Sequence, residues 1–246
     1  MNQDTRQVAI VTGASRGIGA AIARRLAEDG YRIVVNYANN AAEAEKVVGA
    51  LREAGHGAVA VKADVSQADE VRALFDAAER EFGRVDVLVN NAGVLKTMPL
   101  AETSDELFAN TFGINVQGTF NTLREAASRL NDGGRIVNFS TTVLAMKLPG
   151  YAIYSASKAA VEAMSAVFAK ELRGRRIRVN TVAPGPVATE LFFSGKTQEQ
   201  IDTFARMPPL ERLGEPEDIA RVVSFLASEE SGWVNGQVLR ANGGTI

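Results

Sequence analysis

The stretch Val8-Ala9-Ile10-Val11-Thr12-Gly13-Ala14-Ser15-Arg16-Gly17-Ile18-Gly19 decides how the chain folds. It begins as a short apolar strand, passes through a glycine-rich turn and continues into helix-forming residues. Gly13 can adopt backbone angles closed to other residues, Gly17 lets the main chain approach a ligand, and Gly19 lets the helix pack near the strand. The N-terminal N–H groups and positive dipole end of a helix over residues 17–29 would face this turn, an arrangement that suits a pyrophosphate.

The glycines follow the spacing Gly-x-x-x-Gly-x-Gly, which differs from the commoner Gly-x-Gly-x-x-Gly fingerprint of dinucleotide-binding turns. A structural glycine turn is the alternative interpretation. We favour dinucleotide binding because a strand precedes the turn and a helix follows it at the start of a first βαβ unit. The predicted contacts in this turn are Gly13, Ser15, Arg16, Gly17, Ile18 and Gly19.

Composition excludes several classes of function. The chain has 246 residues, 46% hydrophobic and 23% charged, as in ordinary globular proteins. With 27 basic and 29 acidic residues, it carries no charge excess that would favour nucleic acid or an anionic membrane. It has no cysteine for disulfides or thiolate metal sites, and its one histidine, His56, lies in a predicted turn, so we expect no metal. No apolar signal core or membrane-length run is present, and we expect a cytoplasmic protein.

Strands and helices alternate along the whole chain. Further strands are predicted at residues 32–36, 58–62, 85–90, 135–140, 177–183 and 237–240, and further helices at 41–54, 70–82, 104–129, 151–172 and 216–226. This alternation indicates an α/β fold: a single Rossmann-type domain over residues 1–246, with a doubly wound parallel sheet of about seven strands and helices on both faces. Periodicity weakens over residues 186–209, where a functional lid is favoured over a plain surface loop.

The end of the second strand bears on the choice of dinucleotide. NAD usually meets an acidic side chain there, which accepts from the ribose hydroxyls. This chain has Asn36, Tyr37 and Ala38 as the predicted cofactor contacts there, so no carboxylate would repel a 2′-phosphate. The Arg16 guanidinium could bind that phosphate through two charge-assisted hydrogen bonds, although Arg16 could also be a solvated turn residue. We therefore predict that NADP(H) is preferred over NAD(H).

Tyr154 and Lys158 lie four residues apart, which places a phenol and an ammonium on the same face of one helix. A free tyrosine has a pKa of about 10 and exchanges protons slowly at neutral pH. A nearby ammonium stabilises the phenolate and is expected to bring the tyrosine pKa toward neutral. On its own the pair is a weak signal, because Tyr and Lys at this spacing are commonly structural.

Several motifs in order make the chain resemble the classical short-chain dehydrogenase/reductase family over essentially all 246 residues. The resemblance is carried by the glycine turn with Thr12, Asn90-Asn91-Ala92-Gly93, Asn115, Tyr154-x-x-x-Lys158, Pro184-Gly185-Pro186-Val187-x-Thr189, the segment 214–220, and Gly243-Gly244. It implies hydride transfer between a nicotinamide and a carbonyl or secondary alcohol.

The resemblance also implies roles for individual residues. Tyr154 would protonate the carbonyl oxygen, Lys158 would hold the nicotinamide ribose and lower the Tyr154 pKa, and Asn115 would anchor a proton-relay water. The other implied cofactor contacts are Asp64 and Val65 at the adenine, Asn91, Ala92 and Gly93 at the adenosine ribose, Val187 and Thr189 at the carboxamide, with Pro184 and Gly185 before them.

One position departs from the family pattern. The family places a serine thirteen residues before the tyrosine to bind the substrate oxygen, and here that position is Thr141. Neighbouring side chains on a strand face opposite ways, so using Ser140 would require a bulge. We assign the hydroxyl to Thr141, which has the same donor and acceptor capacity, and keep Ser140 as the alternative.

The predicted pocket wall is mostly apolar. It comprises Leu95, Met98, Val143, Leu144, Met146 and Tyr151, with Leu191, Phe192, Phe193, Phe204 and Met207 from the lid. Such a wall suits an acyl, alicyclic or aromatic ketone, although the lid residues could instead only exclude water over the nicotinamide.

Three functions remain open from the sequence. The first is an NADPH-dependent reductase of small or medium ketones, and the second is a 3-oxoacyl thioester reductase similar to 3-oxoacyl-acyl-carrier-protein reductases. An acidic acyl carrier protein would require basic residues near the site; Arg173, Arg175, Arg176 and Arg178 could supply them or be a solvated charge run. The third is a dinucleotide-binding regulator without turnover. The family resemblance also implies a homotetramer, with apolar residues on helix 151–172 serving as contacts or as core.

Overall fold

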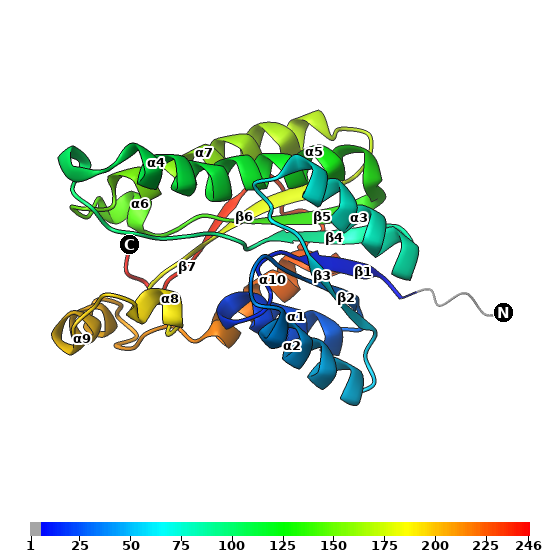
Figure 1. Cartoon of the computed structure of the whole chain (residues 1–246), viewed down its shortest axis with the longest axis horizontal. Helices are drawn as coiled ribbons and strands as arrows, with labels where there is room; N and C mark the ends of the chain where they lie inside the picture. The colour runs from blue at the N-terminus through cyan, green and yellow to red at the C-terminus, as the bar shows by residue number, and fades with distance from the viewer. Residues whose placement is uncertain (1–5) are drawn as a thin grey trace.

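The computed structural model describes residues 6–246, and its centre is a seven-stranded parallel sheet in the order β3-β2-β1-β4-β5-β6-β7 (Figure 1). The strands are β1 (Val8–Val11), β2 (Arg32–Tyr37), β3 (Ala58–Lys62), β4 (Val85–Asn90), β5 (Leu130–Phe139), β6 (Arg178–Pro184) and β7 (Val238–Ala241). The predicted fold class is confirmed: the sheet is parallel, doubly wound and Rossmann-like.

Helices cover both faces of this sheet. One layer contains α1 (Gly17–Glu28), α2 (Ala41–Glu53) and α10 (Pro216–Ala227); the other contains α3 (Ala68–Phe82), α5 (Gly118–Arg129) and α7 (Ala152–Glu171). The side chains of β1 alternate between the two layers, as the pleat requires. Ala9 and Val11 pack in the first core, whereas Val8 and Ile10 pack in the second. Both sets are almost completely buried, which accounts for the continuous apolar run in the sequence.

The strand order reverses between β1 and β4, which are neighbours in the sheet although two strands separate them in sequence. Helices then run on opposite sides of the sheet, leaving a crevice beyond the carboxyl ends of these strands. The glycine turn follows β1 and the Asn91-Ala92-Gly93 segment follows β4. Both therefore lie at the edge where a ligand binds in a doubly wound sheet.

The predicted uninterrupted helix over residues 104–129 is wrong in one detail. The chain forms α4 (Asp105–Phe112), one wider π turn η2 (Gly113–Gln117), and then α5. A π turn inserts a residue into the hydrogen-bond ladder and is frequent at functional sites. Asn115 lies in this turn and is 1% exposed. The π turn therefore sets the direction of the side chain of a candidate site residue.

The segment 186–209 contains two short helices, α8 (Glu190–Phe193) and α9 (Gln198–Arg206), in place of a plain loop. Thr197 and Gln200 form a reciprocal capping box at the start of α9. These helices project beyond the sheet beside its carboxyl edge (Figure 1). Within residues 6–246, no helix combines the length and apolar character needed to cross a membrane.

Candidate active site

The glycine turn is held against the segment that follows β4. Gly13 has φ +61°, and a Cβ there would lie 2.9 Å from the Ala92 Cα. A Cβ on Gly19 would collide with the Gly13 carbonyl oxygen. The Asn91 amide donates to the carbonyls of Thr12 and Gly13 at 2.9 and 3.1 Å. Larger side chains at these glycines would push the two loops apart, so the turn can be this tight only with glycine.

The N-terminus of α1 fits the phosphates of a dinucleotide. Its N-cap residue, Arg16, makes no side-chain capping hydrogen bond, so the first N–H groups of the helix are not satisfied by a cap. Ser15, Gly17 and Ile18 surround this end and are half-buried. Free N–H groups at the positive end of a twelve-residue helix favour an anion.

Arg16 forms an ion pair that the sequence did not indicate. Its Nη1 lies 2.8 Å from Oε2 of Glu190, at the first turn of α8, and both side chains are mostly exposed. Arg16 therefore links the glycine turn to the lid. Its predicted contact with a 2′-phosphate remains a prediction.

Asn36 supports the turn through its side chain, and its predicted contact with the cofactor stays a prediction. It is 1% exposed. Its Oδ1 accepts from the Gly13 N–H at 3.2 Å, and its Nδ2 donates to the Ala63 carbonyl at 2.9 Å. All these partners lie inside the protein, so this amide is turned away from solvent. Tyr37 and Ala38 follow it and are half-buried at the end of β2.

The predicted adenine residues follow β3 as expected. The Asp64 carboxylate accepts from both the N–H and the hydroxyl of Ser66, which fixes the turn. Val65 is buried beneath the helix that follows the π turn, where a Cβ on Gly118 would lie 2.6 Å from its Cγ2. This close packing holds the loop after β3 against α5.

Asn115 joins three segments. Its Oδ1 accepts from the Val94 N–H at 2.9 Å, and its Nδ2 donates to the Val94 carbonyl and the Ser157 hydroxyl, both at 3.0 Å. Its side chain thus ties the π turn to the loop after β4 and to α7, which carries Tyr154. A Cβ on Gly93 would lie 3.2 Å from the Asn115 Oδ1.

Tyr154 and Lys158 both line the crevice, one helical turn apart on α7. Lys158 is 5% exposed, and its Nζ donates to the Phe139 carbonyl at 2.9 Å. The Lys158 Nζ lies 5.9 Å from the centre of the Tyr154 ring. Burial lowers the pKa of Lys158 to about 8.

The expectation that the ammonium lowers the Tyr154 pKa is wrong for this structure. Burial raises the pKa of Tyr154 to about 12, a hydrogen bond with Thr141 opposes this rise, and the neighbouring Tyr151 adds to it. Desolvation of the phenolate is the largest cause, and Lys158, whose ammonium donates to the Phe139 carbonyl, is not among the groups that shift this pKa. The phenol is therefore fully protonated at neutral pH.

The structure separates the two candidate hydroxyls. The Thr141 side chain opposes the rise of the Tyr154 pKa, and its hydroxyl accepts from the Val143 N–H at 3.2 Å. The Ser140 hydroxyl instead donates to Oε1 of Glu162 at 2.5 Å. Both residues follow β5 and are buried. Thr141 is thus the hydroxyl beside the phenol, while the Ser140 hydroxyl is engaged elsewhere.

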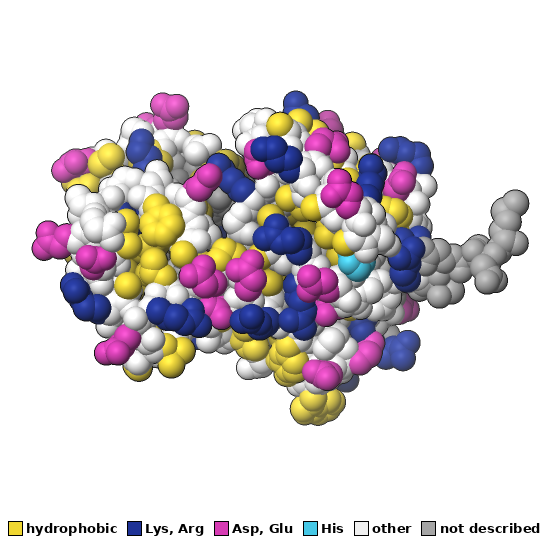
Figure 2. All heavy atoms as spheres, turned by 90° about the horizontal axis from the view of Figure 1, so that it is seen from below, with side chains coloured by type: hydrophobic (Ala, Val, Ile, Leu, Met, Phe, Trp, Pro, Cys, Tyr) yellow, Lys and Arg dark blue, Asp and Glu magenta, His cyan; other side chains and the backbone are white. Residues whose placement is uncertain are grey.

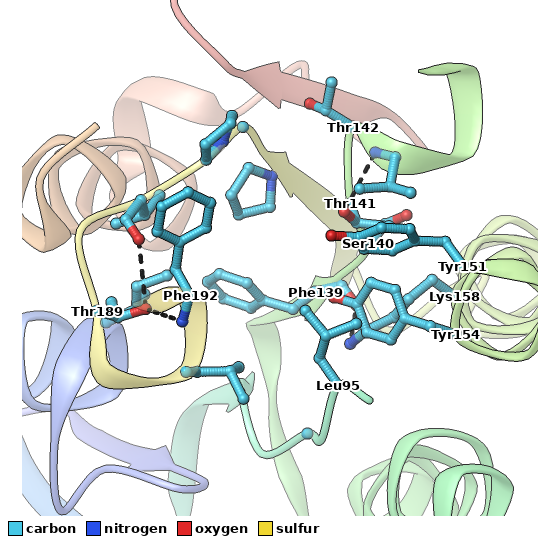
Figure 3. Close-up of a pocket in the computed structure, with 18 of the residues that line it drawn as sticks. Leu95, Phe139, Ser140, Thr141, Thr142, Tyr151, Tyr154, Lys158, Thr189 and Phe192 are labelled. Carbon is cyan, nitrogen blue, oxygen red and sulfur yellow. Dashed lines mark hydrogen bonds between the residues drawn. The ribbon is translucent and has the colours of Figure 1, made fainter. Parts of the chain in front are cut away.

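A pocket lies between the lid and α7. Phe192 and Thr189 lie on one side of it, Tyr151 and Tyr154 lie on the other, and Leu95 is on a third side (Figure 3). Of the predicted wall, seven residues line the pocket: Leu95, Val143, Met146, Tyr151, Leu191, Phe192 and Phe204. Met98, Leu144, Phe193 and Met207 do not. Phe193 and Met207 face outward, and Figure 2 shows hydrophobic side chains on this side of the molecule, around the lid.

The segment after β6 forms one wall of the pocket, which Pro184, Gly185, Val187 and Thr189 all line. Val187 pairs with Gly214 in an isolated bridge. The Thr189 hydroxyl accepts from the Phe192 N–H at 3.2 Å and so caps α8. A Cβ on Gly17 would lie 3.5 Å from Thr189, which shows how close this wall is to the glycine turn.

The arginine cluster lies at the opposite end of the sheet. Arg178 begins β6, whereas the pocket lies beyond the carboxyl ends of the strands. Arg175 pairs with Asp132 at 2.8 Å, and Arg178 donates to the Ser228 carbonyl at 2.7 Å. These arginines therefore cannot flank the pocket entrance, and they support the interpretation of a structural and solvated charge run.

Sequence reasoning missed three residues near the site. Glu190 pairs with Arg16, the Phe139 carbonyl accepts from Lys158, and Lys196 lines the pocket. No sequence signal indicated any of them, because the periodicity that would orient side chains weakens over residues 186–209 and the Phe139 contact is made by the main chain. Among residues 6–246, no group of three or more His, Cys, Asp or Glu side chains could hold a metal ion.

Known proteins resemble the chain over nearly its full length. A family model described as enoyl-(acyl carrier protein) reductase matches residues 13–245. A short-chain type dehydrogenase/reductase of Picea abies is 48% identical, over 98% of this chain and 92% of that protein. An NADPH-dependent aldehyde reductase-like protein of Arabidopsis thaliana, named as chloroplastic, is 46% identical, over 98% and 94%. A short chain dehydrogenase from Burkholderia cenocepacia, crystallised with NADP, superposes with a TM-score of 0.93 at 33% identity, over 99% of both chains.

Proposed function

The chain belongs to the short-chain dehydrogenase/reductase family and is an oxidoreductase that uses a nicotinamide dinucleotide, and we propose that it transfers hydride from NADPH to aldehyde or ketone carbonyls. The names of the relatives support both parts of this proposal: one is an NADPH-dependent aldehyde reductase-like protein, and one was crystallised with NADP. We treat residues 1–246 as one domain, of which the first five residues lie outside the described part.

One observation carries the proposal: the Tyr154 phenol lines the crevice at the carboxyl ends of the strands together with Lys158 and Thr141. With a pKa of about 12 the phenol holds its proton at neutral pH, which is the state that reduction of a carbonyl requires. The nicotinamide supplies the hydride when it is bound. Tyr154 donates the proton to the carbonyl oxygen, and Thr141 orients that oxygen.

The remaining roles follow from position. Lys158 would hold the nicotinamide ribose, because its side chain lines the same pocket as Tyr154, one turn away on α7. Asn115 would anchor a relay water near the π turn. The uncapped start of α1 supports pyrophosphate binding, and the lack of a carboxylate on Asn36, Tyr37 and Ala38 supports NADP(H) over NAD(H).

The apolar wall supports a small or medium aldehyde or ketone as substrate. Leu95, Met146, Phe192 and Phe204 are among its lining residues, and the lid helix α8 supplies one side. Closing these residues over the nicotinamide would also exclude water. The lid role of residues 186–209 is part of the same proposal.

Two alternatives carry less support. A 3-oxoacyl thioester reductase agrees with the description of the matching family model, but the arginine cluster lies at the far end of the sheet from the pocket. A regulator without turnover would not require Tyr154, Thr141 and Lys158 to be assembled in one pocket. An acyl carrier protein therefore remains a secondary candidate partner.

We further propose a homotetramer in the cytoplasm. Exposed apolar side chains lie on two separate surfaces: Phe108, Phe120 and Val167 on α4, α5 and α7, and Phe225 and Val238 on α10 and β7. On α7, Val161 and Met164 pack in the core, whereas Val167 is free for a contact between subunits. Light scattering after gel filtration would test the tetramer. For the compartment, the absence of cysteine agrees with the cytoplasm.

The decisive experiment is a screen of NADPH oxidation over aldehydes, ketones, 3-oxo thioesters and quinones, followed by absorbance at the nicotinamide band. We expect turnover with aldehydes or ketones of medium size, and slower turnover with NADH. Turnover of thioesters alone would favour the acyl carrier alternative. NADP+ binding without turnover of any carbonyl would favour the regulator.

A further inference from the structure

Lys196 introduces a positive charge into an otherwise apolar pocket wall. Among the described residues that line the pocket, the only charged side chains are Lys158 and Lys196, and none is a carboxylate. Lys158 is directed at the Phe139 carbonyl and belongs to the proposed reaction centre. Lys196 has no place in that chemistry, so its presence in the wall requires another explanation.

The Lys196 ammonium has few partners. Its Nζ donates to the Phe192 carbonyl at 2.6 Å and lies 4.7 Å from the centre of the Phe192 ring. No carboxylate of residues 6–246 forms an ion pair with it. An ammonium has three N–H donors, and one neutral carbonyl satisfies only one of them. Partial burial lowers the pKa of Lys196, in agreement with this shortage of compensating charge.

The position of Lys196 relative to the reacting groups is informative. Lys196 follows α8, and its ammonium contacts Phe192. Phe192 lies on the lid side of the pocket, opposite Tyr154 (Figure 3). A substrate whose carbonyl reaches Tyr154 would extend its other end toward the lid. Two further lysines, Lys96 and Lys147, directly follow the lining residues Leu95 and Met146 and are exposed.

From this geometry we propose that the enzyme prefers carbonyl compounds that carry an anionic group at the end distant from the carbonyl, and that Lys196 binds this group. The inference rests on the proposed carbonyl reduction and names its substrate class. A carboxylate or phosphate would give Lys196 a charge-assisted hydrogen bond in a partly desolvated site, where such bonds are strong. The apolar wall would contact the body of the same molecule.

A purely structural role for Lys196 predicts different behaviour. Its bond to the Phe192 carbonyl caps the last turn of the four-residue helix α8. Lys196→Gln keeps an N–H donor for that carbonyl but removes the charge, whereas Lys196→Arg keeps the charge. Lys170→Gln is a matched control, because Lys170 is an exposed lysine near the far end of α7, about 24 Å along the helix from Tyr154.

The test compares para-formylbenzoate with its uncharged methyl ester as substrates with NADPH. In the wild type and in Lys196→Arg, the ratio of kcat/KM for the acid to that for the ester should exceed the ratio in Lys196→Gln by about tenfold. The control Lys170→Gln should keep the wild-type ratio. Because each variant is measured with both aldehydes, their different intrinsic reactivities cancel.

A second arm identifies the source of the anion. It compares acetoacetyl coenzyme A with acetoacetyl-N-acetylcysteamine, which lacks the phosphates. If Lys196→Gln lowers kcat/KM only for acetoacetyl coenzyme A, relative to acetoacetyl-N-acetylcysteamine, the recognised anion is a carrier phosphate. The inference then stands. If the substitution lowers kcat/KM only for para-formylbenzoate, relative to its methyl ester, the recognised anion belongs to the small substrate.

Binding separates this inference from the proposed function. Calorimetry of the NADP+-loaded protein with para-hydroxymethylbenzoate and its methyl ester requires no turnover. An unchanged acid-to-ester ratio in Lys196→Gln, in both kinetics and binding, would overturn the inference while leaving carbonyl reduction intact. If no carbonyl compound is reduced, but the acid still binds more tightly than the ester and Lys196→Gln removes this difference, the proposed function is overturned and the anion site stands.

Discussion

Arg16 of the glycine turn and Glu190 of the lid are 174 residues apart in sequence, yet their side chains form an ion pair at 2.8 Å. The two side chains are 68% and 78% exposed, so solvent screens the pair and its contribution to stability is small. Its importance is positional, because Arg16 is the cation proposed for the 2′-phosphate. Glu190 therefore competes with that phosphate for the same guanidinium.

Glu190→Gln should strengthen binding of NADP+ by about threefold and leave NAD+ unchanged, since exposed ion pairs of this kind contribute at most about 1 kcal/mol. The wild type should bind NADP+ at least about tenfold more tightly than NAD+, equivalent to about 1.4 kcal/mol. Fluorescence titration measures both constants. In an Arg16→Ala background, the Glu190→Gln effect should disappear. Equal affinities of the wild type for the two dinucleotides would reject the role of Arg16.

Tyr154→Phe should abolish carbonyl reduction while NADP+ binding changes by less than about threefold. The substitution removes only the hydroxyl that donates the proton, and general acid catalysis of this kind contributes about 10²–10⁴-fold to the rate. Single-turnover measurements with NADPH give the rate, and titration gives the affinity. Tyr151→Phe serves as a comparison, because Tyr151 also lines the pocket. A Tyr154→Phe enzyme with wild-type turnover would show that another group is the acid.

The sheet and the glycine turn could be predicted because their signals are local. The strands β3 and β4 have the predicted bounds, residues 58–62 and 85–90, and the i, i+4 spacing alone places Tyr154 and Lys158 on one face. The π turn at Gly113–Gln117 could not be predicted. It depends on the three hydrogen bonds of Asn115 to segments distant in sequence.

Contacts between segments distant in sequence account for the remaining differences between the predicted site and the structure. Asn36 could be placed at the end of β2, but the direction of its amide depends on Gly13 and Ala63, whose positions follow from sheet packing. The pKa of Tyr154 depends on how deeply α7 packs, which the spacing of two residues does not show. Lys196 could not be recognised at all, because the lid carries no periodicity that would orient it.

Thr141→Ala should lower kcat by about a hundredfold, whereas Thr141→Ser should keep most of it. The reason is that the Thr141 side chain acts on the Tyr154 pKa within the same pocket, and loss of one donor to a developing oxyanion costs about 10²–10³ in rate. Ser140→Ala removes the bond to Glu162 and should mainly reduce stability, by about 1–2 kcal/mol. Steady-state kinetics and urea unfolding of the three variants provide the measurement. A larger loss of kcat in Ser140→Ala than in Thr141→Ala would reverse the assignment.

Lys158→Met should increase the free energy of unfolding at pH 6–7, and the gain should shrink as the pH rises above 8. The folded-state pKa of Lys158 is about 8, against its usual 10.5, so the unfolded chain holds more protons than the folded protein between these values. Wild-type stability therefore rises with pH across this window, and the methionine variant lacks this dependence. The lowered pKa of Lys158 corresponds to a destabilisation of the wild type by at most about 3 kcal/mol at pH 6–7. The variant loses the hydrogen bond to the Phe139 carbonyl, which reduces its gain in free energy of unfolding by about 1 kcal/mol. Urea unfolding of both proteins from pH 6 to pH 9.5 measures the difference. If the free energies of unfolding of the wild type and of Lys158→Met change in parallel with pH, Lys158 is not charged in a desolvated site.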